Sequence, residues 1–502
     1  MLHLTKIFLL INSLDLNRGG LTKANLQQAN IFNEMGYETY ILTFNYNGDY
    51  KRVINKLRKI HNISMKVKII NMYDYFRNEK NIVSKEITLD DLINKNSITE
   101  KVLNQNAIKL YENGLYKKLV KYRKDKSIKK VDHFDNNLSH LKSEFYTLDG
   151  YIGKISYMDY NLESPAQMLF YKSDSNCYLR KNVNPKNGLA TKVDLINDKK
   201  ITRSFDNDKF LKTYFVEEII KNNKKSIIIS DARNTDEILI NINNSGNIKK
   251  YIRLHTNHLD ESGNISANTK EAIENLNSID GLLVLTNQQK NDIINEFGFS
   301  KKIKVIPHGI KINPILDNNM QKRENVAVVI SRLVDIKQIN HIIEAINLIK
   351  NHLTNFALEI YGIGKEYNYL KDLVIFYGLE KIVLFKGYTN NPIKIYKKSL
   401  FSLVTSKSEG FTLSILESMS CGTPVIAYNF NYGPNEIIDN NENGFIVKNN
   451  DIEELSKKIL YLLKRKDLLE YMGNKAKDKI SVTFSKEKVT EMWHILFNES
   501  NQ

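Results

Sequence analysis

The sequence has little cysteine and no hydrophobic run long enough to cross a membrane. Cys177 and Cys421 are the only two cysteines among 502 residues, and they lie far apart in different contexts. This scarcity excludes a disulfide scaffold and a cysteine metal cluster, and it suits a reducing compartment. No stretch approaches the roughly 20 apolar residues that a membrane-spanning helix needs, so no segment is expected to span a bilayer.

Several other signals are missing as well. The apolar run KIFLLI near the N-terminus is short, and no small-residue cleavage site follows it, so we interpret it as a first buried strand and not as a signal peptide. Tandem repeats, long low-complexity segments and a Gly-x-Ser-x-Gly nucleophile elbow are also missing from the sequence. We therefore expect a soluble, cytoplasmic protein that does not use a hydrolase-type nucleophile.

Positive charge is present in excess. The chain has 73 Lys and Arg against 57 Asp and Glu, a net charge of +16. Such an excess favours polyanionic partners. A genome rich in A and T explains it equally well, because its codons often encode lysine, asparagine and isoleucine. With 42% hydrophobic and 10% aromatic residues the chain has ample material for folded cores, and its length predicts two or three domains.

The order of apolar segments predicts an α/β protein with two doubly wound, Rossmann-like domains that face a cleft. Buried strands alternate with amphipathic helices at both ends of the chain, whereas short alternating strands separated by Asp-Gly and Asn-rich breaks fill residues 130–203. Residues 77–105, before these strands, are polar and are expected to be helical or irregular. The predicted parts are a split N-terminal domain (1–75 and 205–315), an inserted β-rich domain (76–204), a C-terminal domain (316–485) and a C-terminal helix that packs back on the first domain (486–502).

Weak phosphate-binding signals lie at the expected carboxyl edges of the sheets. Gly19 and Gly20 precede the first helix, and glycines there let backbone N–H groups approach a phosphate, although a plain turn explains most such pairs. Arg332 and Lys337 follow the first strand of the second domain, where fixed cations can neutralise a diphosphate without a metal. Gly362 ends the next strand and is weak evidence alone.

The strongest signal is the stretch SKSEGFTLSILESMSCGTPVIAYNFNYGPNEII, residues 406–438. Glu409 and Gly410 precede a predicted helix, so Glu409 is suited to accept hydrogen bonds from sugar hydroxyls. The helix contains Glu417, which is suited to bind vicinal hydroxyls such as those of a ribose. The backbone N–H groups of Phe411, Thr412 and Leu413 are expected to point at an anion between the two carboxylates. The alternative is an ordinary surface helix whose two glutamates are solvated and bind no ligand.

The pattern E-G-(x)2-L-S-(x)2-E-(x)3-C-G-T-P-V-I, with GPNEII and ENGFIV after it, resembles the retaining GT-B glycosyltransferases of the glycogen-synthase-like group. In that family the first glutamate contacts the donor sugar and the second contacts the nucleotide ribose, which assigns these roles to Glu409 and Glu417. The resemblance also matches Arg332 and Lys337 to the family's diphosphate-binding pair, and Gly20 to the glycine of the first loop.

A narrower resemblance links the N-terminal stretch LDLNRGGLTKANLQQANIFNEMGYETYILTFNYNGDY, the β-rich insertion and IRLHTNHLDESG to the wall teichoic acid α-glycosyltransferases of Gram-positive bacteria. It implies that the insertion is a hub for self-association, commonly as a homotrimer. A related branch that glycosylates serine-rich adhesins shares the architecture. The family places a histidine of the HTNH segment in the donor-sugar pocket, for which we favour His255 over His258, although a histidine at a strand end is more often a packing or capping residue.

These signals together predict a UDP-sugar-dependent, retaining hexosyltransferase that moves glucose or N-acetylglucosamine to hydroxyls of a poly(ribitol phosphate) or poly(glycerol phosphate) wall teichoic acid with α linkage. We expect no metal and no cofactor beyond the UDP-sugar, because the DND segment (206–208) stands in a polar linker before a helix, where capping explains it. Peripheral association with the inner face of the membrane is also expected. The alternatives are a protein O-glycosyltransferase acting on serine-rich or Ser-Asp-repeat adhesins, and a non-catalytic protein that binds nucleotide sugars or polyanions. A nucleic-acid-binding protein is disfavoured because the lysines are dispersed.

Overall fold

The structure is a computed structural model, and it describes residues 5–16, 20–79, 87–92, 98–104, 106–243, 246–298, 300–312 and 324–501. The chain divides into two compact units, Met1–Lys250 and Tyr251–Gln502. Each unit is described by itself. No helix of the described residues is both long enough and apolar enough to cross a membrane.

The first unit contains a parallel sheet with strand order β14-β1-β2-β3. Its strands are β1 (Thr5–Ile11), β2 (Glu38–Thr43), β3 (Lys68–Asn71) and β14 (Lys225–Ser230). Its helices are α1 (Gly20–Glu34), α2 (Tyr50–His61), α3 (Met72–Arg77), α5 (Asp208–Ile220) and α6 (Asp236–Ile240). Residues 7–10 of β1 are fully buried, as expected for a strand covered on both faces. The Asn207 side chain caps α5 by accepting hydrogen bonds from Lys209 N and Phe210 N, so the predicted cap lies in the DND segment but on its asparagine.

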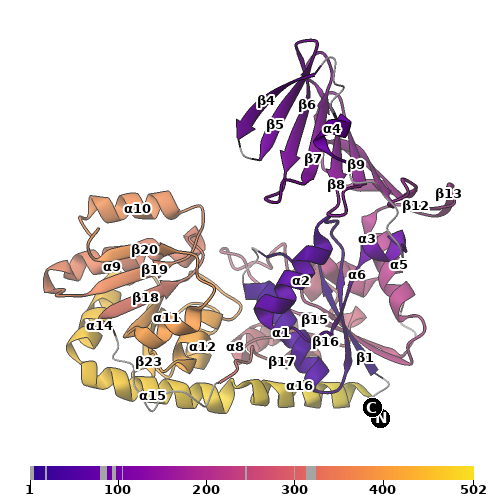
Figure 1. Ribbon diagram of the computed structural model, residues 1–502. Helices are drawn as coiled ribbons and strands as arrows, with labels where there is room; N and C mark the ends of the chain where they lie inside the picture. The colour runs from indigo at the N-terminus through magenta and orange to yellow at the C-terminus, as the bar shows by residue number, and fades with distance from the viewer. Residues whose placement is uncertain are drawn as a thin grey trace. The chain divides into compact units, whose positions relative to one another are not determined.

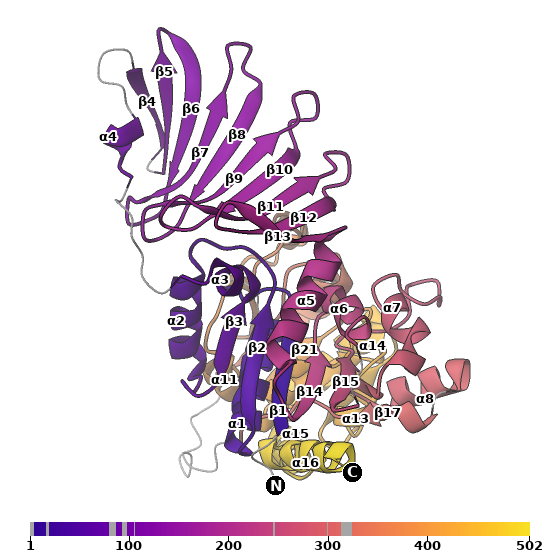
Figure 2. The same ribbon diagram turned by 90° about the vertical axis from the view of Figure 1, so that its right-hand side faces the viewer.

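The same unit carries a ten-stranded antiparallel sheet in which each strand pairs with its neighbour in sequence (Figure 2). The strands are β4 (Ile98–Asn104), β5 (Ala107–Glu112), β6 (Leu115–Tyr122), β7 (Ile128–Phe134), β8 (His140–Tyr146), β9 (Ile152–Met158), β10 (Pro165–Tyr171), β11 (Cys177–Val183), β12 (Ala190–Asn197) and β13 (Lys200–Phe205), with a short helix α4 (Leu89–Leu92) before them. The predicted β-meander is confirmed. Self-association through this sheet stays a prediction.

The meander begins earlier in the chain than the sequence indicated. Residues 98–104, expected to be helical or irregular, form β4 and pair with β5. The prediction failed because ITEKVLN lacks the regular alternation of apolar and polar residues that marks a half-buried strand. The next turn has a clearer local cause. Asn113 and Gly114 both have positive φ, at 51° and 78°, which is the Asn-Gly turn that suits a two-residue hairpin.

The second unit begins within β15 (Ile248–Arg253), which pairs in parallel with β16 (Gly281–Val284), and β16 pairs with β17 (Ile303–Val305). Its first helices are α7 (Lys270–Glu274) and α8 (Asn287–Phe297). The C-terminal helix α16 (Lys486–Asn501) contacts these strands: Lys304 Nζ lies 3.0 Å from Glu499 Oε2, and the Arg253 guanidinium lies 5.3 Å from the Trp493 ring. The domain limits predicted from the sequence stay predictions.

A six-stranded parallel sheet with order β20-β19-β18-β21-β22-β23 forms the rest of the second unit (Figure 1). Its strands are β18 (Val326–Ile330), β19 (Ala357–Tyr361), β20 (Val383–Gly387), β21 (Phe401–Val404), β22 (Val425–Tyr428) and β23 (Gly444–Val447). Its helices are α9 (Ile339–Ile349), α10 (Tyr367–Phe376), α11 (Pro392–Lys398), α12 (Leu413–Ser420), α13 (Pro434–Ile437), α14 (Ile452–Lys464) and α15 (Lys466–Thr483). The α/β rhythm that the sequence predicted is confirmed here.

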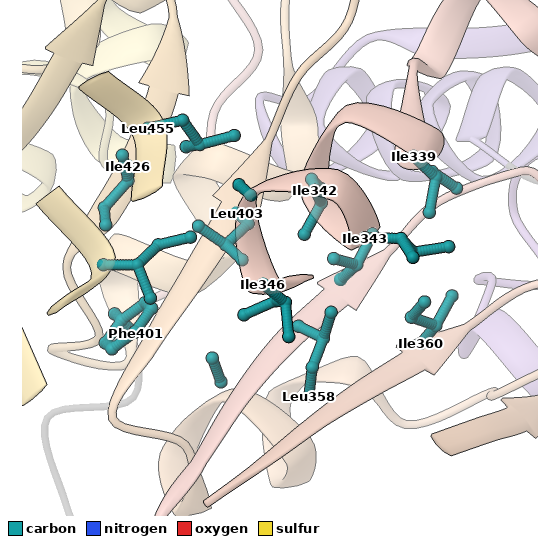
Figure 3. Close-up of a cluster of buried hydrophobic side chains, with 14 of the residues drawn as sticks. Ile339, Ile342, Ile343, Ile346, Leu358, Ile360, Phe401, Leu403, Ile426 and Leu455 are labelled. Carbon is teal, nitrogen blue, oxygen red and sulfur yellow. The ribbon is translucent and has the colours of Figure 1, made fainter. Parts of the chain in front are cut away.

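Both faces of this sheet are buried because successive side chains of a strand point to opposite sides. On one face, Leu358, Phe401 and Ile426 pack with isoleucines of α9 (Figure 3). On the other face, Val425 and Ala427 pack with apolar residues of α12 and α15. The packed helices hold the strands in place, so the loops at the carboxyl ends of the strands are held at one edge of the sheet.

Candidate active site

The sequence-predicted residues of the second domain gather at the carboxyl edge of the six-stranded sheet. Arg332 and Lys337 follow β18, Gly362 follows β19, and Glu409 follows β21. Since β18 pairs with both β19 and β21, these three loops are neighbours. Ligands of doubly wound sheets bind at this edge, where the loops of adjacent strands meet.

Lys337 and Glu409 form an ion pair at the centre of this edge, between Lys337 Nζ and Glu409 Oε1. The Lys337 and Glu409 side chains are only 17% and 21% exposed. Ser406 Oγ donates a second hydrogen bond to Glu409 Oε1 at 2.9 Å. Both charges are therefore partly shielded from water. At such a shielded position their interactions with a ligand are stronger than at an open surface.

The backbone beneath Lys337 is fixed by the end of β21. Lys337 closes a short 3-10 turn, η5 (Asp335–Lys337), in which its N–H donates to Val334 O at 2.9 Å. The Thr405 hydroxyl donates to Lys337 O at 3.0 Å. This hydroxyl couples the loop after β18 to the loop after β21, so the position of the ammonium group does not depend on the ion pair alone.

The segment after β22 holds Glu409 on its other side. Glu409 N donates to Asn431 O at 2.9 Å, and Tyr432 N donates to Glu409 O at 2.7 Å. Gly433 has φ 119°, a conformation that favours glycine, and it lies within ordinary van der Waals contact distance of Thr412. Sequence reasoning missed Asn431 and Tyr432, and the signal available was their place directly before the GPNEII stretch.

Gly410 lies against the backbone of the HTNH segment. A Cβ at this position would stand 2.2 Å from His255 O and 2.5 Å from Thr256 N, distances that real Cβ atoms do not reach. Only glycine therefore permits this approach. Asn257 Nδ2 donates to Ser408 Oγ at 3.1 Å in the same region. The structure thus brings His255 to the Glu409 loop, two sites that lie about 150 residues apart in the sequence.

His308, which the sequence reasoning did not select, lies between His255 and Phe411. Its ring stacks on His255 with centroids 5.3 Å apart and lies 5.9 Å from the Phe411 ring. Burial, together with the neighbouring Arg253 and His255, holds the pKa of His308 well below its ordinary value. His308 is therefore neutral at pH 7 and supports the two neighbouring rings without adding charge to the site.

The helix α12 begins where an anion site was predicted. Thr412 is its N-cap, but the Thr412 side chain makes no capping hydrogen bond, and Thr412 Oγ1 is buried without a hydrogen-bond partner among the described residues. Within the same residues, the N–H groups of Phe411, Thr412 and Leu413 donate no hydrogen bond. Unsatisfied amides at a helix start attract negative charge. Glu417 lies half-buried in the second turn of the helix.

Arg332 and Gly362 complete the edge. Arg332 is exposed and forms no ion pair within the described part of the chain. Gly362 has φ 153°, and a Cβ there would overlap Ser331 O at 1.8 Å, so glycine lets the loops after β18 and β19 lie together. In the first unit, α1 begins at Gly20, and Gly19 lies outside the described residues. The donor-binding roles predicted for these residues stay predictions.

His258 is placed differently from His255. It has no exposed surface, and its Nδ1 lies 3.4 Å from the hydroxyl of Tyr432, which donates to Asp292 Oδ2 at 2.8 Å. Burial lowers the pKa of His258, and Glu296, 3.8 Å from its Nε2, opposes this in part. A side chain enclosed in this way positions the Tyr432 segment, so we keep His255 as the candidate for contact with substrate.

The depressed pKa values of His258 and His308 predict that the protein loses stability in mild acid. As the pH falls below about 6.5, the unfolded chain binds protons that the folded histidines do not, which lowers the free energy of unfolding by up to about 1.4 kcal/mol per pH unit for each histidine. Urea titrations at pH 7.5 and 5.5 measure this slope. His308→Asn removes one such proton and should make the slope shallower. An unchanged slope in the variant would contradict the assignment.

Among the described residues, no group of three or more His, Cys, Asp or Glu side chains is arranged to hold a metal ion. The groups of the site that can attract an anion are the cations of Arg332 and Lys337 and the amides at the start of α12.

Comparisons with known proteins place this chain in a family. Residues 315–479 match the family model described as Glycosyl transferases group 1. Over 505 aligned residues, 98% of this chain and 99% of the relative, the sequence is 30% identical to a poly(ribitol-phosphate) alpha-N-acetylglucosaminyltransferase of Staphylococcus aureus. This chain belongs to the GT-B glycosyltransferases.

The glycosyltransferase is similar over its length to further proteins. It is 25% identical to a poly(glycerol-phosphate) alpha-glucosyltransferase of Bacillus subtilis, over 96% of this chain and 73% of the relative. The crystal structure of TarM matches with a TM-score of 0.86 and 29% identity over 98% of each chain. The pneumococcal O-GlcNAc transferase GtfA, in complex with UDP and GlcNAc, matches with a TM-score of 0.81 but only 17% identity, over 99% of each chain, which shows a shared fold alone.

Proposed function

We propose that this glycosyltransferase transfers glucose or N-acetylglucosamine from a UDP-sugar to a hydroxyl group of a wall teichoic acid, a poly(ribitol phosphate) or poly(glycerol phosphate), with retention of the α configuration. Two relatives aligned over nearly all of this chain support the acceptor class, because their names specify poly(ribitol-phosphate) and poly(glycerol-phosphate). The crystal structure of a mutant of S. aureus TarM matches this chain with a TM-score of 0.87. That mutant was crystallised with UDP and alpha-GlcNAc-glycerol, which supports a UDP-sugar as the donor.

The observation that carries the proposal is the half-buried Lys337–Glu409 pair beside the unpaired amides of α12. In the proposed complex Lys337 and Arg332 neutralise the diphosphate, and the N–H groups of Phe411, Thr412 and Leu413 add the positive end of the helix dipole. Glu409 accepts hydrogen bonds from the donor sugar, and Glu417 accepts them from the ribose. Each residue then performs a role that its atoms support.

The chemical step follows from where charge develops. As the bond between the anomeric carbon and the diphosphate breaks, negative charge grows on the leaving oxygen, where the fixed cations and amides stabilise it. The acceptor hydroxyl attacks from the same face, and its proton passes to the departing phosphate, which preserves the α configuration. The donor-site roles of His255, Gly20 and Gly362 belong to this proposal. So do independence from metal ions, a cytoplasmic location and association with the inner face of the membrane.

A protein acceptor is the second candidate. The chain is 23% identical over 65% of its length to a UDP-N-acetylglucosamine–peptide N-acetylglucosaminyltransferase GtfA subunit of Streptococcus agalactiae. This relative is less similar and aligned over less of the chain than the two polymer-modifying enzymes, so we rank a serine-rich protein acceptor second.

A donor-by-acceptor screen tests the proposal. UDP-glucose and UDP-N-acetylglucosamine are each mixed with purified poly(ribitol phosphate), poly(glycerol phosphate) and a Ser-Asp-repeat protein, with and without EDTA, and UDP release is followed together with sugar transfer. We expect transfer to a teichoic acid that EDTA leaves unchanged, with an α linkage by NMR. Transfer to the protein alone would overturn the acceptor, and loss of activity with EDTA would overturn the metal-free mechanism.

A further inference from the structure

A polar cavity of about 450 Å³ lies in the C-terminal part of the second unit, apart from the ion pair just described. Four of its six lining residues are asparagines. The lining residues are Asn429, Asn435, Asn440, Ile446, Lys448 and Asn449. Ligand pockets are usually lined mainly by apolar side chains, so this lining points to a ligand that is itself rich in polar groups.

The cavity lies along the same sheet edge as Glu409. Asn429 directly follows β22, and Lys448 and Asn449 directly follow β23. Because β21, β22 and β23 are adjacent parallel strands, their carboxyl ends form a row that starts at the Glu409 loop. Two hydrogen bonds join the row: Glu409 N donates to Asn431 O, and Gln338 Nε2 donates to Asn450 Oδ1 at 2.8 Å.

Part of the lining is held in place, and part is available to a ligand. Asn435 Nδ2 donates to Asn429 Oδ1 at 2.5 Å, and Ile446 N donates to Asn440 Oδ1 at 3.0 Å, so these amides are oriented by the fold. The side chains of Lys448 and Asn449 are exposed and have no hydrogen-bond or ion-pair partner among the described residues.

The charge of the cavity favours an anion. None of its lining residues is acidic. The four carboxylates nearest in sequence have partners that do not line the cavity. Glu436 accepts a hydrogen bond from Gln288 N, and Asp439 forms an ion pair with Lys479. Glu442 accepts a hydrogen bond from the Tyr471 hydroxyl, and the Asp451 side chain caps α14. Lys448 is the one charged residue of the lining, so the lining itself carries a net positive charge. Primary amides both donate and accept hydrogen bonds, so they match the vicinal hydroxyls of a polyol, while the ammonium matches a phosphate.

We propose that this cavity is a subsite for the acceptor polymer, which holds a polyol-phosphate unit beyond the one that receives the sugar. Lys448 binds the phosphodiester, and the asparagine amides bind the polyol hydroxyls. The inference rests on the proposed function, since it assumes a polyol-phosphate acceptor. It adds that affinity for long polymers comes partly from a site outside the donor pocket, so a chain of several repeats binds better than a single unit.

The test is a double variant, Lys448→Ala with Asn449→Ala, in the full-length protein. We expect the KM for poly(ribitol phosphate) or poly(glycerol phosphate) of more than ten repeats to rise about tenfold, the loss typical of a charged contact. The kcat, the KM for the UDP-sugar and the KM for a single polyol-phosphate unit should stay within twofold of the unmodified protein. Lys457→Ala, which removes an equal charge from an exposed position of α14, should leave the polymer KM unchanged.

Each other outcome has a distinct meaning. An unchanged polymer KM overturns the subsite, and so does an equal rise in the KM for the UDP-sugar, which would instead place the donor in the cavity. If the unmodified protein transfers sugar to no polymer, the proposed function fails. In that case calorimetric titration of the same polymers into the unmodified protein and the double variant still tests the cavity, because equal affinities overturn it.

Discussion

Replacing Lys337 with methionine should lower kcat by about two to three orders of magnitude while the KM for the acceptor changes little. The ammonium is the half-buried cation at the centre of the site, and the loss of one preorganised group that stabilises a leaving oxyanion typically costs this much. The variant also leaves Glu409 with Ser406 Oγ as its remaining side-chain hydrogen-bond donor in the described residues. Single-turnover sugar transfer, measured with saturating UDP-sugar, gives the rate.

The matched control is Lys398→Met. Lys398 lies in α11 of the same domain and pairs with Glu324 at 2.7 Å, but both side chains are about half exposed. An exposed ion pair contributes little, so this variant should retain near-normal kcat and stability. The two variants make the same change of charge and size, and circular dichroism checks that both are folded. Near-normal turnover of the Lys337→Met variant would contradict the role proposed for Lys337 in stabilising the leaving diphosphate.

Replacing Gly410 with alanine should lower kcat at least tenfold and the free energy of unfolding by about 1–3 kcal/mol. The added Cβ overlaps His255 O and Thr256 N, and backbone atoms move aside less readily than the end of a side chain. Relief of the overlap displaces Glu409, the adjacent residue, from Lys337 and Ser406. Urea unfolding measures the stability, and the transfer assay measures kcat.

Ser408→Ala separates this steric effect from the loss of nearby hydrogen bonds. Ser408 Oγ accepts from Asn257 and donates to Asn431 O at 3.1 Å, so alanine removes two hydrogen bonds without adding an atom that clashes. We expect a smaller loss of stability, about 1 kcal/mol, and a kcat within a few-fold of normal. If Gly410→Ala behaves like Ser408→Ala, the close approach to His255 does not govern the site.

Much of the fold was predictable because the apolar runs in the sequence coincide with the buried strands of the structure. The apolar runs KIFLLI, VAVVI and VIAY form parallel strands that are largely buried, as expected for sheets covered by helices on both faces. The pattern around Glu409 and Glu417 likewise predicted a strand, a loop and a helix, which are β21, the Glu409 loop and α12. The strand β4 was missed because its sequence, ITEKVLN, has no regular alternation of apolar and polar residues.

The sequence by itself determined the α/β rhythm, the inserted meander, and the glycine and the two glutamates of the proposed donor site, since each depends on residues close together in the chain. Only the tertiary structure decided which groups surround Glu409. Lys337 and Asn431 come from two separate segments, and their approach depends on strand order and on how closely loops pack, neither of which leaves a local pattern. The two histidines of HTNH show the same limit. They are alike in sequence, but tertiary packing encloses His258 and places His255 against Gly410.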